Sequence, residues 1–327
     1  METTTPALGA EDRHVPVLLR ACVDLLVPAL QEPGAVYVDA TLGMAGHAVA
    51  VLDAAPGARL VGIDRDEQAL ALARERLERA GHGERIELVH ATYDEIPDVL
   101  CELGLPAADA VMMDLGLSSF QIDTAERGFS YVGDAPLDMR MDTSAPTTAA
   151  DILRDADEAE IARILHEYGD ERFARRIARR VVEARATAPL ERSSQLVALV
   201  DAAIPAAVRA TGGHPAKRTF QALRIAVNAE LEILARAVDG ALDAVRVGGR
   251  VVVESYHSGE DRLVKSAFGR RTRSSAPAGL PVELAEHSPT FRALTRGAVT
   301  ADEAEQSSNS RSASVRLRAV ERTRAGS

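Results

Sequence analysis

The sequence predicts an α/β protein, a doubly wound, Rossmann-like parallel sheet interrupted by a block of helices. Short apolar runs that end in an acid alternate with helix-like stretches in the first third of the chain, as strands and crossover helices do. A central stretch shows only helical periodicity, and a strand-like run then resumes. Together these observations favour one sheet whose sequence is split by a helical insertion.

The expected strands share one form, an apolar run bounded by turn residues. They cover residues 36–41, 59–64, 85–90, 109–114 and 250–255, with an alternating edge or hairpin strand at 314–320. Between the second and third strands, Asp66 is a plausible N-cap for a helix with apolar residues at helical spacing. Residues 45–55 are long enough for the preceding crossover helix.

The middle of the chain is predicted to be helical. Periodicity of 3.6 runs from about residue 124 to 213, and a long amphipathic helix follows over 220–238, stopped by Gly248 and Gly249. We therefore expect a first sheet segment at 1–124, a helical insertion at 125–213 and a second sheet segment at 214–327.

The composition is that of an ordinary globular protein. Of 327 residues, 46% are hydrophobic and 27% are charged. The net charge of −11 argues against a protein that binds nucleic acid nonspecifically through its overall charge. Two cysteines exclude a disulfide scaffold. The first sixteen residues have no apolar core, and no apolar run reaches the roughly 20 residues of a membrane span. The expected compartment is the cytoplasm.

The turn 43–47 is the predicted cofactor site. Gly43 and Gly46 lie between the first strand and the following helix, so backbone N–H groups can approach a ligand. The alternative is a tight strand-to-helix turn that binds no ligand. Asp64 ends the next strand, where a carboxylate can accept ribose hydroxyls, and Asp114 ends the fourth. A dinucleotide cofactor would prefer the pattern G-x-G-x-x-G, but here Ala45 stands where a middle glycine could lie. S-adenosyl-L-methionine has no phosphate and tolerates such a turn, so it is the favoured cofactor.

Several blocks of the chain resemble one known family. They are 14–19 (HVPVLL), 43–47 (GMAGH), 114–121 (DLGLSSFQ), 126–130 (ERGFS), 136–142 (PLDMRMD), 169–174 (GDERFA), 214–224 (HPAKRTFQALR) and 255–262 (SYHSGEDR). On these blocks the chain resembles the RsmH (MraW) family of 16S rRNA (cytosine-N4)-methyltransferases, over about residues 14–322. The departures are Ala45 for a usual glycine, Gly259 for a usual leucine and Ser310 for a usual proline.

The resemblance implies a Rossmann-like methyltransferase fold, a substrate-recognition role for the helical insertion at 125–213, a cofactor and a reaction. S-adenosyl-L-methionine would methylate N4 of cytidine 1402 in the decoding centre of 16S rRNA, within the small ribosomal subunit. The cofactor residues that it implies are Ala45, Gly46, His47, Asp64, Tyr93, Asp114 and Gln121.

Methyl transfer to an aromatic amine requires acceptors that hold its N–H bonds in line with the donor. The expected acceptors are the Asp114 carboxylate and the hydroxyls of Ser118 and Ser119, and an N-cap or turn is the alternative for the two serines. Further acceptors with less support are Asp138, Asp142 and His257.

One helix of the insertion is strongly basic. A solvated face is the ordinary explanation, and rRNA phosphate binding is the favoured one. The expected RNA-binding residues are Arg172, Arg175, Arg176, Arg179, Arg180, Lys217 and Arg218.

No metal site is expected, because the histidines 14, 47, 214 and 257 are scattered along the chain. A homodimer is compatible with the sequence, which does not fix the oligomeric state. Two rival functions stay open: a nucleotide-dependent oxidoreductase, and a non-catalytic RNA-binding factor that retains the fold.

Overall fold

The computed structural model describes residues 16–206, 214–274, 276 and 287–325. The chain forms two compact units, each of which is described by itself. The first comprises Met1–Gly116 and Leu231–Ser327, and the second comprises Leu117–Glu230. Two segments far apart in sequence therefore build the first unit, and the second unit occupies the stretch of sequence between them.

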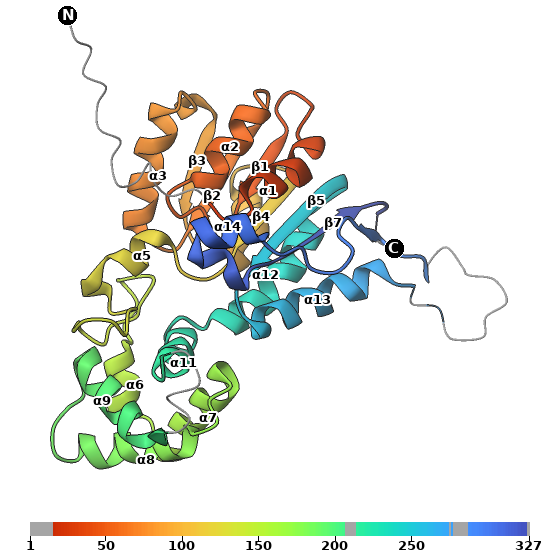
Figure 1. Cartoon of the computed structure of the whole chain (residues 1–327). Helices are drawn as coiled ribbons and strands as arrows, with labels where there is room; N and C mark the ends of the chain where they lie inside the picture. The colour runs from red at the N-terminus through yellow and green to blue at the C-terminus, as the bar shows by residue number, and fades with distance from the viewer. Residues whose placement is uncertain (1–15, 207–213, 275, 277–286, 326–327) are drawn as a thin grey trace, which may run out of the picture. The chain divides into compact units, whose positions relative to one another are not determined.

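The first unit is built on a seven-stranded sheet with the order β3-β2-β1-β4-β5-β7-β6 (Figure 1). The strands are β1 (Val36–Asp39), β2 (Arg59–Asp64), β3 (Ile86–His90), β4 (Ala108–Asp114), β5 (Val245–Ser255), β6 (Phe291–Ala293) and β7 (Arg316–Arg322). The strands from β3 to β5 are parallel, and β7 pairs antiparallel with both β5 and β6.

All six expected strands are present, with two corrections. β5 begins at Val245, so Gly248 and Gly249 lie inside it instead of ending a helix. β7 is not at the edge, because β6 pairs with its outer side. The doubly wound parallel sheet is confirmed.

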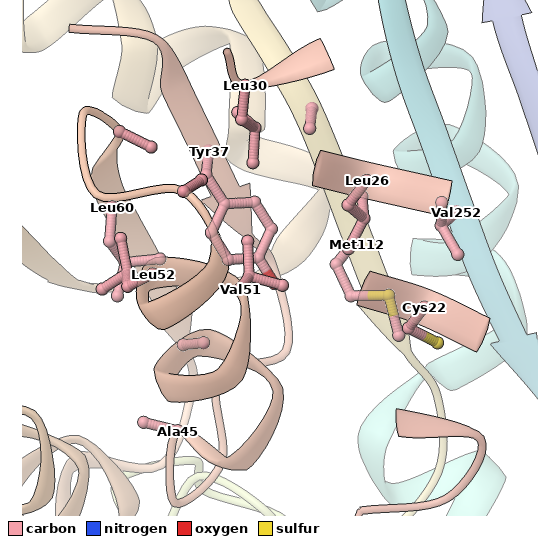
Figure 2. Packing of buried hydrophobic residues seen from close by; sticks show 14 of the residues in the cluster. Cys22, Leu26, Leu30, Tyr37, Ala45, Val51, Leu52, Leu60, Met112 and Val252 are labelled. Atoms are coloured by element: carbon pink, nitrogen blue, oxygen red, sulfur yellow. The ribbon is translucent and has the colours of Figure 1, made fainter. Parts of the chain in front are cut away.

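Successive side chains along each strand point to opposite faces of the sheet, and both faces are buried. On β1, Tyr37 joins one apolar cluster while Val36 and Val38 join the other, which explains why the whole strand is buried. Helices cover both faces, as in other doubly wound folds. Figure 2 shows the first cluster, in which side chains of the helices α1 and α2 pack onto Tyr37, Leu60 and Met112.

The helices of this unit follow the strands closely. They are α1 (Leu19–Leu26), η2 (Val27–Ala29), α2 (Gly46–Ala54), α3 (Glu67–Arg79), η3 (Gly83–Arg85), η4 (Tyr93–Glu95), α4 (Ile96–Glu102), α12 (Glu230–Ala244), α13 (Ser258–Thr272), α14 (Glu303–Ser308) and η7 (Ser310–Ser314). Asp66 caps α3 as expected, since its side chain accepts the Gln68 N–H at 3.1 Å.

The second unit is helical around its own apolar core. Its helices are α5 (Ser119–Asp123), η5 (Ala125–Arg127), α6 (Ala149–Asp155), α7 (Glu158–Gly169), α8 (Ala174–Arg185), α9 (Ser193–Ala203) and α11 (Lys217–Asn228). α7 and α11 approach closely at Gly169, where an added Cβ would lie 2.6 Å from the Arg218 carbonyl oxygen. This contact requires glycine at the end of α7.

The predicted long helix is two helices, which shifts the division of the chain. Ala229 adopts a left-handed conformation with φ 48° and separates α11 from α12. Phe220 and Leu223 on α11 belong to the core of the second unit. The units therefore divide after residues 116 and 230, whereas the sequence placed the divisions after 124 and 213.

Within the described ranges, no helix combines the length and the apolar character that crossing a membrane requires.

Candidate functional site

Four acids lie at the ends of four neighbouring parallel strands of the first unit. Asp64 ends β2, Asp39 ends β1, Asp114 ends β4, and Glu254 lies beside Asp114 in the β4–β5 register. The order of the strands reverses between β1 and β4, where ligands of open α/β sheets bind. Thr41, which follows β1, connects the ends of these two strands: its hydroxyl accepts the Asp114 backbone N–H at 2.6 Å.

The turn between β1 and α2 holds Asp64 in place. The backbone N–H of Gly43 donates to one carboxylate oxygen of Asp64 at 2.8 Å, and the N–H of Asp66 donates to the other at 2.9 Å. Each oxygen keeps a further lone pair. Burial raises the pKa of Asp64 to about 6, although both backbone hydrogen bonds oppose that shift.

Ala45 takes the left-handed conformation that its turn requires. Its φ is 58°, its side chain is fully buried, and α2 starts at the next residue. A glycine would adopt this conformation without the contact between Cβ and the following carbonyl that strains an alanine. The alanine methyl instead fills part of the apolar cluster drawn in Figure 2.

Asp114 is held by a tyrosine that the sequence did not single out. The Tyr256 hydroxyl donates to one carboxylate oxygen of Asp114 at 2.8 Å, and Nδ1 of His47 lies 3.7 Å from the other. The Asp114 side chain is 30% exposed, which leaves it accessible to a small group. Burial, the largest cause, raises the pKa of this carboxyl, while His47 and the Tyr256 hydrogen bond lower it.

Behind Asp114 lies a fully buried polar cluster. Nε2 of His47 is 3.7 Å from a carboxylate oxygen of Glu254, and the Cys22 thiol lies 3.4 Å from the other oxygen. Asp39 accepts the Tyr37 hydroxyl at 3.1 Å, and burial raises its pKa to about 6. Glu254 was not among the expected site residues; it stands one residue before the end of β5, whereas Asp39, Asp64 and Asp114 each end a strand.

The first unit thus brings together Ala45, Gly46, His47, Asp64 and Asp114 at one edge of the sheet. Tyr93 opens η4 just beyond the end of β3 and is half-buried against the apolar cluster that also contains Ile63. Free acceptors for hydroxyl groups, an aromatic ring and a helix start at one sheet edge suit an adenosine-containing cofactor.

Ser118, Ser119 and Gln121 lie in the second unit, at the start of α5. The Ser118 hydroxyl accepts the Gln121 N–H, and the Gln121 side chain accepts the Ser118 N–H, both at 3.2 Å. This reciprocal arrangement is a capping box. The capping alternative for Ser118 is therefore what the structure contains, while Ser119 occupies the first helical position.

The three less supported acceptors are occupied by local structure. Asp138 forms a bidentate ion pair with Arg140, in which Nε and Nη2 donate to the two carboxylate oxygens at 2.8 and 2.7 Å. Asp142 accepts the Ser144 N–H and hydroxyl within one turn. His257 caps α13 by accepting the Gly259 N–H at 3.1 Å. Each side chain has a structural role that accounts for its position.

The basic residues expected to bind RNA lie in the second unit, and all of them are exposed. Arg179 and Arg180 have acidic neighbours on the surface, Glu158 at 3.7 Å and Glu183 at 3.5 Å. Arg218 donates to the Asp170 carbonyl at 2.8 Å. Among the described residues, none forms an ion pair with Arg172, Arg175 or Arg176, which leaves three guanidinium groups for a partner.

Comparisons with known proteins match nearly the whole chain. A model of the "MraW methylase family" matches residues 11–323. Two of the similar proteins are the ribosomal RNA small subunit methyltransferases H of Nocardioides sp. and Saccharopolyspora erythraea. The first is 60% identical over 313 residues, covering 96% of this chain and 98% of the relative. The second is 58% identical over 314 residues, covering 96% and 94%.

Proposed function

The chain belongs to the MraW methylase family, and on that premise we propose that it methylates 16S rRNA, using S-adenosyl-L-methionine, at N4 of cytidine 1402 in the decoding centre. The substrate is the rRNA within the small ribosomal subunit, and the reaction takes place in the cytoplasm. The observation that carries the proposal is the Asp64 carboxylate, which is fixed by two backbone N–H groups and keeps one lone pair on each oxygen.

We assign the cofactor to the sheet edge of the first unit. The free lone pairs of Asp64 accept the two ribose hydroxyls, and the half-buried Tyr93 offers its ring to the adenine. The turn of Ala45, Gly46 and His47 lies at the start of α2, where backbone N–H groups favour the carboxylate of the amino acid portion. Gln121 belongs to the proposed set through the family resemblance.

The bound cofactor supplies an electrophilic methyl group on a sulfonium. The chain must hold the cytosine amine in line with that group, because its lone pair is delocalised into the ring. We propose that Asp114 accepts one amine N–H, and that the Tyr256 hydroxyl keeps the carboxylate oriented. The Ser118 and Ser119 hydroxyls and the carbonyls that follow Asp114 are the next acceptors. After transfer the nitrogen loses a proton readily, so a strong base is not needed.

We propose that the exposed basic residues of the second unit hold the rRNA backbone. Arg172, Arg175 and Arg176 carry the argument because they are exposed and unpaired among the described residues. Arg179, Arg180, Lys217 and Arg218 extend the same proposal. Phosphate binding by such groups releases counterions, so affinity must fall steeply with salt.

The experiment that tests the proposed function is transfer of a labelled methyl group to small subunits from cells lacking the enzyme. Intact subunits, naked 16S rRNA and free cytidine are compared, and the modified nucleoside is identified by mass. We expect N4-methylcytidine at position 1402 from intact subunits. At saturating S-adenosyl-L-methionine, Asp114→Asn should transfer methyl groups at least about 100-fold more slowly, because an amide offers a weaker acceptor.

Other results would replace the proposal. Binding of S-adenosyl-L-methionine without transfer to intact subunits, naked 16S rRNA or free cytidine would indicate another acceptor. Binding of NADH, followed by its fluorescence, would support an oxidoreductase. Binding of the small subunit without binding of the methyl donor would support a non-catalytic RNA-binding factor.

A further inference from the structure

The buried cluster behind Asp114 contains three different metal-ligating side chains. Sγ of Cys22, a ring nitrogen of His47 and a carboxylate oxygen of Glu254 all lie within 4.8 Å of one another. The three side chains come from α1, α2 and the end of β5, and none is more than 6% exposed. One Glu254 oxygen, Oε2, is buried and has no hydrogen-bond partner.

We propose that Cys22, His47 and Glu254 form a binding site for a divalent transition metal of the zinc class. A thiolate, an imidazole and a carboxylate are the ligand types that Zn²⁺ takes in proteins. Cys22 and Glu254 are not among the proposed cofactor contacts, whereas His47 belongs to both sets and Glu254 lies beside Asp114 in the β4–β5 register.

Two separations within the cluster are close to those of tetrahedral coordination, and each involves a different oxygen of Glu254. Bonds of about 2.0–2.3 Å at tetrahedral angles place neighbouring ligand atoms about 3.3–3.7 Å apart. The distance from Cys22 Sγ to Glu254 Oε1 is 3.4 Å, and that from His47 Nε2 to Glu254 Oε2 is 3.7 Å. Nε2 of His47 lies at hydrogen-bond distance, 3.1 Å, from the Val17 carbonyl oxygen, which can only accept, so a metal on Nε2 would replace this hydrogen bond.

The charge of the surroundings also favours a cation. Asp39 and Asp114 lie next to the cluster, and within the described part of the chain no arginine or lysine pairs with Asp39, Asp114 or Glu254. Among the residues that the structure describes, His47 is the basic side chain that lies close to them. Unpaired carboxylates are costly to bury, and a divalent ion would supply the missing positive charge.

A metal on Nε2 would also fix the orientation of His47 toward Asp114. Histidine ligands commonly donate their second N–H to a carboxylate, which sets the tautomer and the angle of the ring. Nδ1 of His47 already lies 3.7 Å from an Asp114 oxygen. Through His47, the metal would therefore help to orient Asp114, the proposed amine acceptor, without taking part in the reaction.

Titration of the full-length, chelator-treated protein with cobalt(II) chloride tests this proposal. Cobalt occupies zinc sites and gives a thiolate-to-metal absorption band. We expect that band to saturate at one equivalent. Cys22→Ser should abolish it, and Glu254→Gln should weaken cobalt binding at least about tenfold. Cys101→Ser is the matched control, because Cys101 is the other cysteine and is exposed.

A second measurement needs no variant. The melting temperature of the unaltered protein should rise in proportion to the logarithm of zinc chloride concentration, because only the folded chain assembles the site. Absence of a thiolate band in the unaltered protein, or a band that persists in folded Cys22→Ser, would overturn the site. A melting temperature that zinc does not raise would do the same.

Discussion

The two units place their charged side chains in opposite environments. In the first unit, burial raises the pKa of Asp39, Asp64 and Asp114, which lie at the ends of strands. In the second, the pKa of Asp155 and Glu160 falls, first because of hydrogen bonds from Arg154 and Arg163 on the surface. Acidic side chains are thus harder to ionise at the strand ends of the first unit, where we propose ligand binding, and easier to ionise on the exposed surface of the second. Each prediction below tests one side of this comparison.

The largest effect should come from removing Asp64, the half-buried acceptor at the end of β2 in the first unit. Asp64→Ala removes two hydrogen bonds to a charged group, about 1.5–3 kcal/mol each, so S-adenosyl-L-methionine should bind at least about 100-fold more weakly. Calorimetric titration measures this directly. Asp155→Asn, an exposed acid of the second unit, should leave the affinity unchanged. Equal losses in both variants would remove the distinction between the units.

A buried polar residue also holds the second unit together. The Asn228 side chain accepts the Met141 N–H at 2.7 Å and donates to the carbonyls of Met139 and Arg224, both at 2.8 Å. Asn228→Ala should lower the free energy of unfolding by about 3 kcal/mol, because buried backbone groups lose their partners. Denaturant unfolding measures the loss, and hydrogen exchange should locate it in the second unit. The exposed Glu183→Ala should change stability by less than about 0.5 kcal/mol.

Charge reversal tests the surface of the second unit. Arg176→Glu combined with Arg180→Glu should weaken binding to the small subunit about tenfold or more and flatten its salt dependence. Filter binding over a range of salt concentrations measures both. Arg20→Glu with Arg74→Glu makes the same charge change on exposed helices of the first unit and is expected to have little effect. If the two pairs behave alike, overall charge and not this surface governs binding.

The raised pKa of Asp64 predicts that cofactor binding depends on pH. Below about 6 the carboxyl is protonated and loses an acceptor, so affinity should fall up to about tenfold per pH unit. The linked effect on folding has the opposite direction. Because the folded pKa exceeds the unfolded one, Asp39 and Asp64 make the fold more stable as pH falls through 6. In Asp64→Asn, the remaining cofactor affinity should not fall between pH 7 and 5.

The smallest effect concerns two alanines in the left-handed conformation. Ala229 is exposed, and Ala229→Gly should raise stability by about 0.5–1 kcal/mol because the strain at φ 48° is released. Ala45 is fully buried, and Ala45→Gly should change stability by less than about 0.5 kcal/mol, since the lost burial of its methyl offsets the same release. Denaturant midpoints of the two variants test whether burial accounts for the difference.

The sequence by itself determined the sheet and its binding edge. Each strand carries a local signal, and the acids that end the strands at Asp39, Asp64 and Asp114 must meet at one edge, because parallel strands share a direction. It also determined the basic face of α8, since helical periodicity alone places those arginines together.

Only the tertiary structure decided where the units divide and which side chains meet inside them. The periodicity of residues 220–238 continues across Ala229, so nothing local revealed that α11 packs in one core and α12 in the other. Cys22 and Glu254 are 232 residues apart in the chain, and they meet because α1 packs against β5. Local patterns record the direction and spacing of side chains, whereas the contacts between distant segments are chosen by packing of the whole core.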